Sequence, residues 1–75
     1  MTATIHPIGE LKKYFDPQNP YANVESGISV REALLHLRVP VEVVALVLVN
    51  EESRSKDYII QEDDAIKIIA VLGGG

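Results

Sequence analysis

The spacing of apolar and polar residues predicts short strands and one helix. Thr2 to Ile8 and Tyr21 to Glu25 are predicted strands. Between them, Glu10 to Phe15 has the apolar spacing of a single helical turn, and a loop with two prolines follows it. Val43 to Val49 is apolar on both faces, which is typical of a strand buried on both sides or one whose outer face awaits a partner.

The second half of the chain predicts two further strands. Asn50 to Ser53 is a predicted turn, Arg54 to Tyr58 a short edge strand, and Glu62 to Asp64 a tight, solvated acidic turn. Ala65 to Val71 is the predicted last strand. Alternation along this strand places one set of side chains on one face (Ile66, Ile68, Ala70) and another on the opposite face (Lys67, Ile69, Val71).

The clearest local signal is a helix start. Ser29 and Glu32 have the spacing of a capping box, in which the hydroxyl accepts from the Glu32 amide and the carboxylate reaches back to the Ser29 amide. Apolar residues then recur at helical spacing up to Leu37. A residue before proline is disfavoured in the α region, so Val39 before Pro40 ends the helix. These signals predict a helix from about Val30 to Arg38.

This order of elements predicts a two-layer α+β domain. One helix of three turns covers one face of a mixed sheet of four or five strands. We expect the first and last strands to lie side by side in the centre, parallel, with the helix in the crossover between them. Residues 1–72 form this single domain, and residues 73–75 form a glycine tail.

Composition excludes several kinds of functional site. The chain has 75 residues, no cysteine and a formal net charge of −4. A disulfide framework, a thiolate metal site and a cysteine nucleophile are therefore excluded, and scattered basic residues argue against nucleic acid. His6 and His36 have no third ligand at a suggestive spacing, and consecutive carboxylates in a tight turn rarely converge, so we expect no metal site. With no targeting or membrane segment in the sequence, we expect a cytoplasmic protein.

The last three residues carry the candidate chemistry. Gly73 and Gly74 have no Cβ and can be gripped closely by a partner, and four extended residues reach about 13 Å. The Gly75 carboxylate can then enter a narrow site and be activated, for instance by adenylation. The alternative is an idle, frayed terminus.

A glycine tail alone would bind a partner weakly, so a surface of the folded domain must also take part in binding. We expect it near the tail, at Ile69, Val71 and Leu72 beside the outer face of Val43 to Val49, unless the Glu10 to Tyr21 segment covers this face.

The whole pattern resembles the MoaD/ThiS family of ubiquitin-like sulfur carriers, which have a β-grasp fold. The residues that carry the resemblance span nearly the whole chain: the capped helix Ser29 to Arg38, Val47-Leu48-Val49-Asn50, Asp57-Tyr58-Ile59-Ile60, Glu62-Asp63-Asp64, and Ile66-Lys67-Ile68-Ile69 before Gly73-Gly74-Gly75. Each piece is unspecific alone, but their order and the C-terminal diglycine are specific together.

The resemblance implies a mechanism and partners. An E1-like adenylating enzyme uses ATP and magnesium to adenylate the terminal glycine, here Gly75, with Gly74 completing the diglycine. A persulfide sulfur donor then forms a thiocarboxylate, which delivers sulfur to a cofactor precursor. The chain itself binds no cofactor and is no enzyme but a protein co-substrate, or the small subunit of a synthase.

Two departures from the family pattern matter. The acidic turn usually holds a Gly-Asp pair, where this chain has Asp63 and Asp64, and the tail has three glycines where two would suffice. Leu11 to Phe15 resembles the molybdopterin-synthase small subunit, whereas Ile66 to Ile69 before triglycine resembles the thiamine sulfur carrier. The molybdopterin branch is slightly favoured. The partner is accordingly a synthase large subunit or a thiazole synthase.

Two other functions stay open at this point. A ubiquitin-like modifier would use the same activation and join Gly75 to lysines of other proteins. A β-grasp interaction module would leave the glycines idle. Deleting Gly74 and Gly75 distinguishes this last function from the other two.

Overall fold

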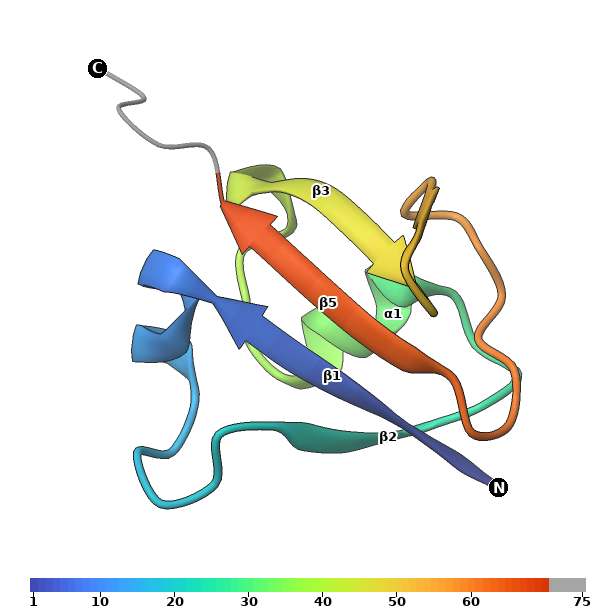
Figure 1. Ribbon diagram of the computed structural model, residues 1–75, viewed down its shortest axis with the longest axis horizontal. Helices are drawn as coiled ribbons and strands as arrows, with labels where there is room; N and C mark the ends of the chain where they lie inside the picture. Colours follow the sequence, from blue (N-terminus) through green and yellow to red (C-terminus); the bar gives the residue numbers. More distant parts are fainter. Residues whose placement is uncertain (71–75) are drawn as a thin grey trace.

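The computed structural model describes residues 1–70. Its elements, drawn in Figure 1, are β1 (Thr2–Ile8), η1 (Gly9–Tyr14), β2 (Ala22–Glu25), α1 (Val30–His36), η2 (Val41–Val43), β3 (Val44–Val49), β4 (Glu52–Arg54) and β5 (Ala65–Ala70), where η marks a 3₁₀ helix. The predicted helical turn after the first strand is therefore η1, which buries Leu11.

The strands form one five-stranded sheet in the order β2-β1-β5-β3-β4. β1 and β5 are parallel and central, with Ile5 opposite Ile66, and the other pairs are antiparallel. This arrangement confirms the predicted α+β fold with a mixed sheet and a central pair formed by the first and last strands. The helix lies in the crossover between them, as the parallel pairing requires.

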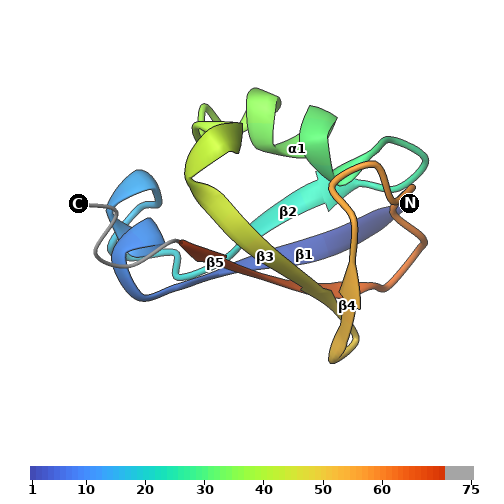
Figure 2. The same ribbon diagram turned by 90° about the horizontal axis from the view of Figure 1, so that it is seen from above.

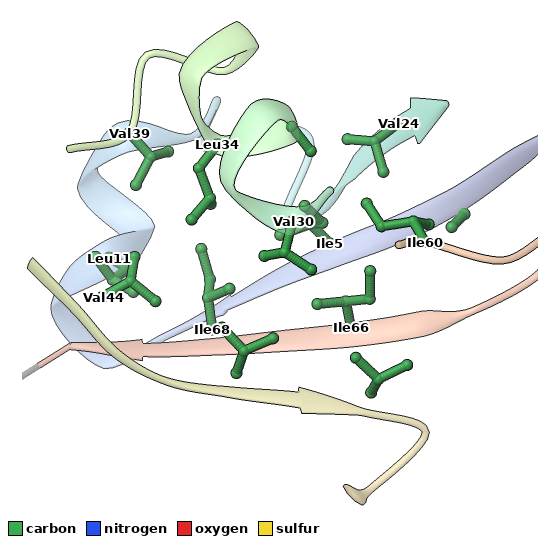
Figure 3. Close-up of a cluster of buried hydrophobic side chains, with 14 residues drawn as sticks. Ile5, Leu11, Val24, Val30, Leu34, Val39, Val44, Ile60, Ile66 and Ile68 are labelled. Atoms are coloured by element: carbon green, nitrogen blue, oxygen red, sulfur yellow. The ribbon is translucent and has the colours of Figure 1, made fainter. Parts of the chain in front are cut away.

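The core lies between the sheet and α1, which covers one face (Figure 2). Side chains of β1 and β5 meet α1 there. Ile5, Ile66 and Ile68 of the strands and Leu34 of the helix are fully buried (Figure 3). Burying one such side chain contributes about 1.5–3 kcal/mol. Within residues 1–70, no helix covers the opposite face of the sheet (Figure 2).

The start of α1 follows its sequence signal, whereas its end comes earlier than predicted. The Glu32 amide donates to the Ser29 hydroxyl (3.1 Å), as expected, but the Glu32 carboxylate accepts from that hydroxyl (3.5 Å) and not from the Ser29 amide. The helix ends at His36, before the predicted Arg38, because Arg38 is left-handed (φ 62°). The amides of Arg38 and Val39 close the last turn by donating to the carbonyls of Leu35 and Leu34, in the pattern of a Schellman motif.

The predicted edge strand over Arg54 to Tyr58 is wrong. The chain turns over only two residues, Asn50 and Glu51, both with positive φ (50° and 72°), and β4 therefore begins at Glu52. The segment after β4 instead provides hydrogen-bond acceptors for the start of α1. The Lys56 carbonyl accepts from the Arg31 amide (2.9 Å) and the Tyr58 carbonyl from the Val30 amide (3.0 Å). These first amides of α1 have no partner inside the helix.

The backbone of the acidic turn suits the Gly-Asp pair that the resemblance implies at this position. Asp63 has a left-handed backbone (φ 67°), and its amide donates to the Thr2 carbonyl (2.9 Å), which joins the turn to β1. Glycine adopts this conformation without strain, and aspartate tolerates it better than most residues. The departure at Asp63 therefore preserves the geometry of the turn.

We expect Asp63→Gly to raise the free energy of unfolding by about 0.5 kcal/mol and Asp63→Val to lower it by about 1–2 kcal/mol, because a β-branched residue is strained at positive φ. Urea denaturation of the two variants measures both effects. A loss of stability in Asp63→Gly would show that the exposed carboxylate, not the backbone, matters at this position.

Candidate functional site

The candidate site is where β5 ends. β5 lies between β1 and β3, so its last residue, Ala70, emerges from the middle of the sheet (Figure 1). Of the residues expected to act in tail chemistry or docking, Ile69 is within the described part. Val71, Leu72 and the tail residues Gly73, Gly74 and Gly75 lie outside the described residues.

An apolar row crosses the sheet beside this exit. Ile8 of β1 and Leu46 of β3 are the cross-strand neighbours of Ile69. All three face away from the helix: Ile8 and Ile69 alternate with the buried positions of β1 and β5, and Leu46 alternates with the buried Val47 and Val49 after a register shift in β3. Ile8 is 39% exposed, Leu46 38%, and Ile69 is half-buried. We refer to Ile8, Ile69 and Leu46 as the apolar row.

A second row, centred on Lys67, lies next to the apolar row on the same face. Lys67 of β5 has His6 of β1 on one side and Leu48 of β3 on the other. The Lys67 ammonium binds both carboxylate oxygens of Glu51, at 2.6 and 3.1 Å. The His6 ring stacks on Tyr21, with 5.2 Å between ring centroids.

The segment from Glu10 to Tyr21, which was the alternative to an open face, lines a groove on this face without covering the apolar row. Lys12 and Pro20 flank β1, and together with His6, Ile8 and Lys67 they line an open groove of about 740 Å³. The apolar row stays accessible at both ends, at Ile8 and Leu46. The open sheet face therefore presents exposed apolar side chains directly beside the end of β5.

At one end of the sheet, the Asp64 carboxylate connects several segments through hydrogen bonds, a role that the sequence did not reveal. We expected the whole acidic turn to be solvated, but Asp64 is only 6% exposed. Its carboxylate accepts from Asn50 Nδ2, the Tyr58 hydroxyl and the Gln61 amide, each at 2.8 Å. Asn50 also exchanges hydrogen bonds with the backbone of Ala65. The carboxylate thereby ties the β3–β4 turn to the first residue of β5.

The environment of Asp64 acts on its pKa in two directions. Burial favours the protonated form, but the Gln61 amide, the Tyr58 hydroxyl and Asn50 together outweigh burial and lower the pKa below its usual value. In turn, the hydrogen bond to Asp64 raises the pKa of Tyr58. Because the folded pKa of Asp64 is depressed, its stabilisation is present above the unfolded pKa, near 4. The stabilisation is lost as the pH falls through the folded value.

We expect Asp64→Asn to lower the free energy of unfolding at pH 7 by about 1–3 kcal/mol, because the amide cannot satisfy three donors. The variant also flattens the fall in stability below pH 4. Thermal unfolding between pH 2 and 7 measures both, with exposed Glu62→Gln as the control. Parallel acid limbs for Asp64→Asn and the wild type would contradict this role.

Within residues 1–70, no three His, Cys, Asp or Glu side chains are placed to hold a metal ion. No helix in this range is long and apolar enough to cross a membrane. The features that stand out are the open sheet face with its apolar row and the central strand β5, which ends beside that row.

Comparison with known proteins agrees with these features. The sequence matches the ThiS family over residues 12–75. The chain belongs to the ThiS family. No curated protein matches the sequence significantly.

Two solved structures share the fold of this ThiS-family chain. The crystal structure of SAMP1 from Haloferax volcanii superposes with a TM-score of 0.71 at 14% identity, over 100% of both chains. The solution structure of Urm1 from Trypanosoma brucei superposes with a TM-score of 0.66 at 18% identity, over 99% of this chain and 95% of that one. These likenesses confirm the ubiquitin-like β-grasp fold.

Proposed function

We propose that this ThiS-family chain is a sulfur carrier. An E1-like enzyme adenylates Gly75 with ATP and magnesium, releasing pyrophosphate. The terminal sulfur of a persulfide then displaces AMP, and a thiol cleaves the resulting acyl disulfide to leave the thiocarboxylate. The observation that carries the proposal is the open sheet face beside the end of β5, in a family member that ends in three glycines. Gly73 and Gly74 let the activating site grip the tail closely, and the chain acts as co-substrate and not as enzyme.

The chemistry needs a separate docking surface. Fixing a glycine tail costs about 1–2 kcal/mol of backbone entropy per residue, so the tail alone binds weakly. The apolar row lies close to the exit of β5 and supplies area to offset this cost. Ile69 is at its centre, and Val71 and Leu72 continue the chain from it toward the glycines. We assign Ile69, Val71 and Leu72 to partner docking together with Ile8 and Leu46.

The delivered sulfur serves molybdopterin or thiamine biosynthesis. A synthase large subunit or a thiazole synthase is the corresponding acceptor partner, and a persulfide protein is the donor. We propose molybdopterin first, because the segment from Leu11 to Phe15 resembles the molybdopterin-synthase small subunit.

The absence of cysteine allows a direct test of thiocarboxylate formation. The protein is incubated with ATP, magnesium, a family activating enzyme and sulfide, then treated with a thiol-alkylating agent, and its intact mass is recorded. Because the unmodified chain has no thiol, one ATP-dependent adduct on the C-terminal peptide identifies a thiocarboxylate at Gly75.

Gly75→Ala is the matched variant. The buried core runs from Ala3 to Ile68, so we expect unchanged thermal unfolding and loss of the adduct. No adduct from the wild type with several activating enzymes would refute the carrier function. A modifier joined to lysines, or an idle tail, would then be the candidates, and a search for lysine conjugates would separate them.

Docking through the apolar row makes a second prediction. We expect Leu46→Ala to weaken binding to the activating enzyme by about 1 kcal/mol, because it removes apolar area that docking would bury. Leu35→Ala is the control, since Leu35 is 60% exposed but lies on α1, on the opposite side of the sheet. Calorimetric titration measures both. Equal effects of the two variants would place docking elsewhere.

A further inference from the structure

Glu51 occupies a position that its own backbone disfavours. It is the second residue of the two-residue turn between β3 and β4, with φ 72°, where such turns favour glycine. Its carboxylate lies against the Lys67 ammonium, and both side chains are largely solvent-exposed (69% and 44%). Exposed ion pairs add little to stability, so stability alone does not account for Glu51.

Lys67 has a distinctive place on the open face. It lies on the central strand β5, one row from the apolar row and next to His6 and Leu48. Lys12 lines the same groove, so two lysines and one carboxylate, that of Glu51, are among its lining residues. This local excess of positive charge contrasts with a chain whose formal net charge is −4.

Charge complementarity identifies the chemistry of the partner. A protein that covers the apolar row also covers Lys67, and leaving an ammonium group covered without a counter-ion is costly. The partner surface therefore needs a carboxylate opposite Lys67. A partner without such a carboxylate must leave Glu51 paired with Lys67, and docking then buries the Glu51 side chain as well.

We propose that Lys67 recognises a carboxylate of the docking protein, and that Glu51 is an intramolecular competitor that occupies Lys67 in the free chain. This inference rests on the proposed function, in which the docking protein is the activating enzyme. On docking, the Glu51 side chain swings into solvent and the partner carboxylate takes its place. Partners that lack an acidic group at this point are disfavoured, since they cannot replace Glu51.

A double-mutant cycle tests the exchange. The dissociation constant for the activating enzyme is measured by calorimetry at low salt for the wild type, Glu51→Gln, Lys67→Gln and the double variant. We expect Glu51→Gln to bind about two- to fivefold more tightly and Lys67→Gln about three- to tenfold more weakly. In the Lys67→Gln background, Glu51→Gln brings no gain, because there is no ammonium group left to release.

Two further measurements separate this exchange from general charge effects. Glu62→Gln removes an exposed carboxylate from a turn outside the groove, and we expect no change in affinity. Salt of about 0.5 M should reduce the differences among the variants, since exposed charges are screened. Thermal unfolding of each variant verifies that it is folded.

Several outcomes overturn the proposal. Glu51→Gln binding equally or more weakly would mean that Glu51 is not a competitor. An equal gain in Glu62→Gln would reduce the effect to net charge, and wild-type affinity in Lys67→Gln would remove Lys67 from recognition. If the wild type forms the thiocarboxylate while these variants behave alike, this inference alone fails. If the wild type forms none, the proposed function fails and this inference fails with it.

Discussion

The parallel pairing of β1 with β5 determines the arrangement of the rest of the molecule. It joins residues 4–8 to residues 65–69, so nearly the entire chain lies in the connection between the two strands. A parallel pair requires a crossover, and the crossover carries α1 onto one face of the sheet. Closing so long a loop is costly in entropy, and the burial of Ile5, Ile66 and Ile68 between the sheet and α1 offsets that cost.

This pairing also relates the fold to the proposed function. Because the last strand is central, the chain leaves the sheet from its middle, with neighbours on both sides of the exit. Ile8 on β1 and Leu46 on β3 flank Ile69 for this reason. An edge strand in the last position would provide a neighbour on one side only. The same helix α1 that buries one face leaves the other face without a covering helix in the described residues, beside the end of β5.

Hydrogen bonds at the other end of the sheet hold the same strands in register. The Asp64 carboxylate connects the β3–β4 turn, the segment before the acidic turn and the start of β5. Asp63 precedes it with a left-handed backbone and binds the Thr2 carbonyl of β1. The two aspartates therefore differ in role: Asp63 supplies a backbone conformation, whereas Asp64 supplies a buried anion that satisfies three donors.

The sequence alone was sufficient for the features that depend on local patterns: the first strand, the capped start of α1 at Ser29, the two faces of β5 up to Ala70, the mixed α+β sheet and the family. Periodicity and capping act over a few residues, so they can be read along the chain. The sequence also identifies Gly75 and the glycines before it as the candidate reactive tail, and their role stays a proposal.

Tertiary structure decided the features that depend on residues far apart in the chain. Burial of Asp64 requires Asn50 and Tyr58 to converge on it, and the Glu51–Lys67 pair requires β3 and β5 to be neighbours. The edge strand is β4 and not Arg54 to Tyr58, because the carbonyls of the latter segment satisfy the amides of α1. Local propensity carries no information about such partners, since a donor or an ammonium group binds whatever acceptor the completed fold brings to it.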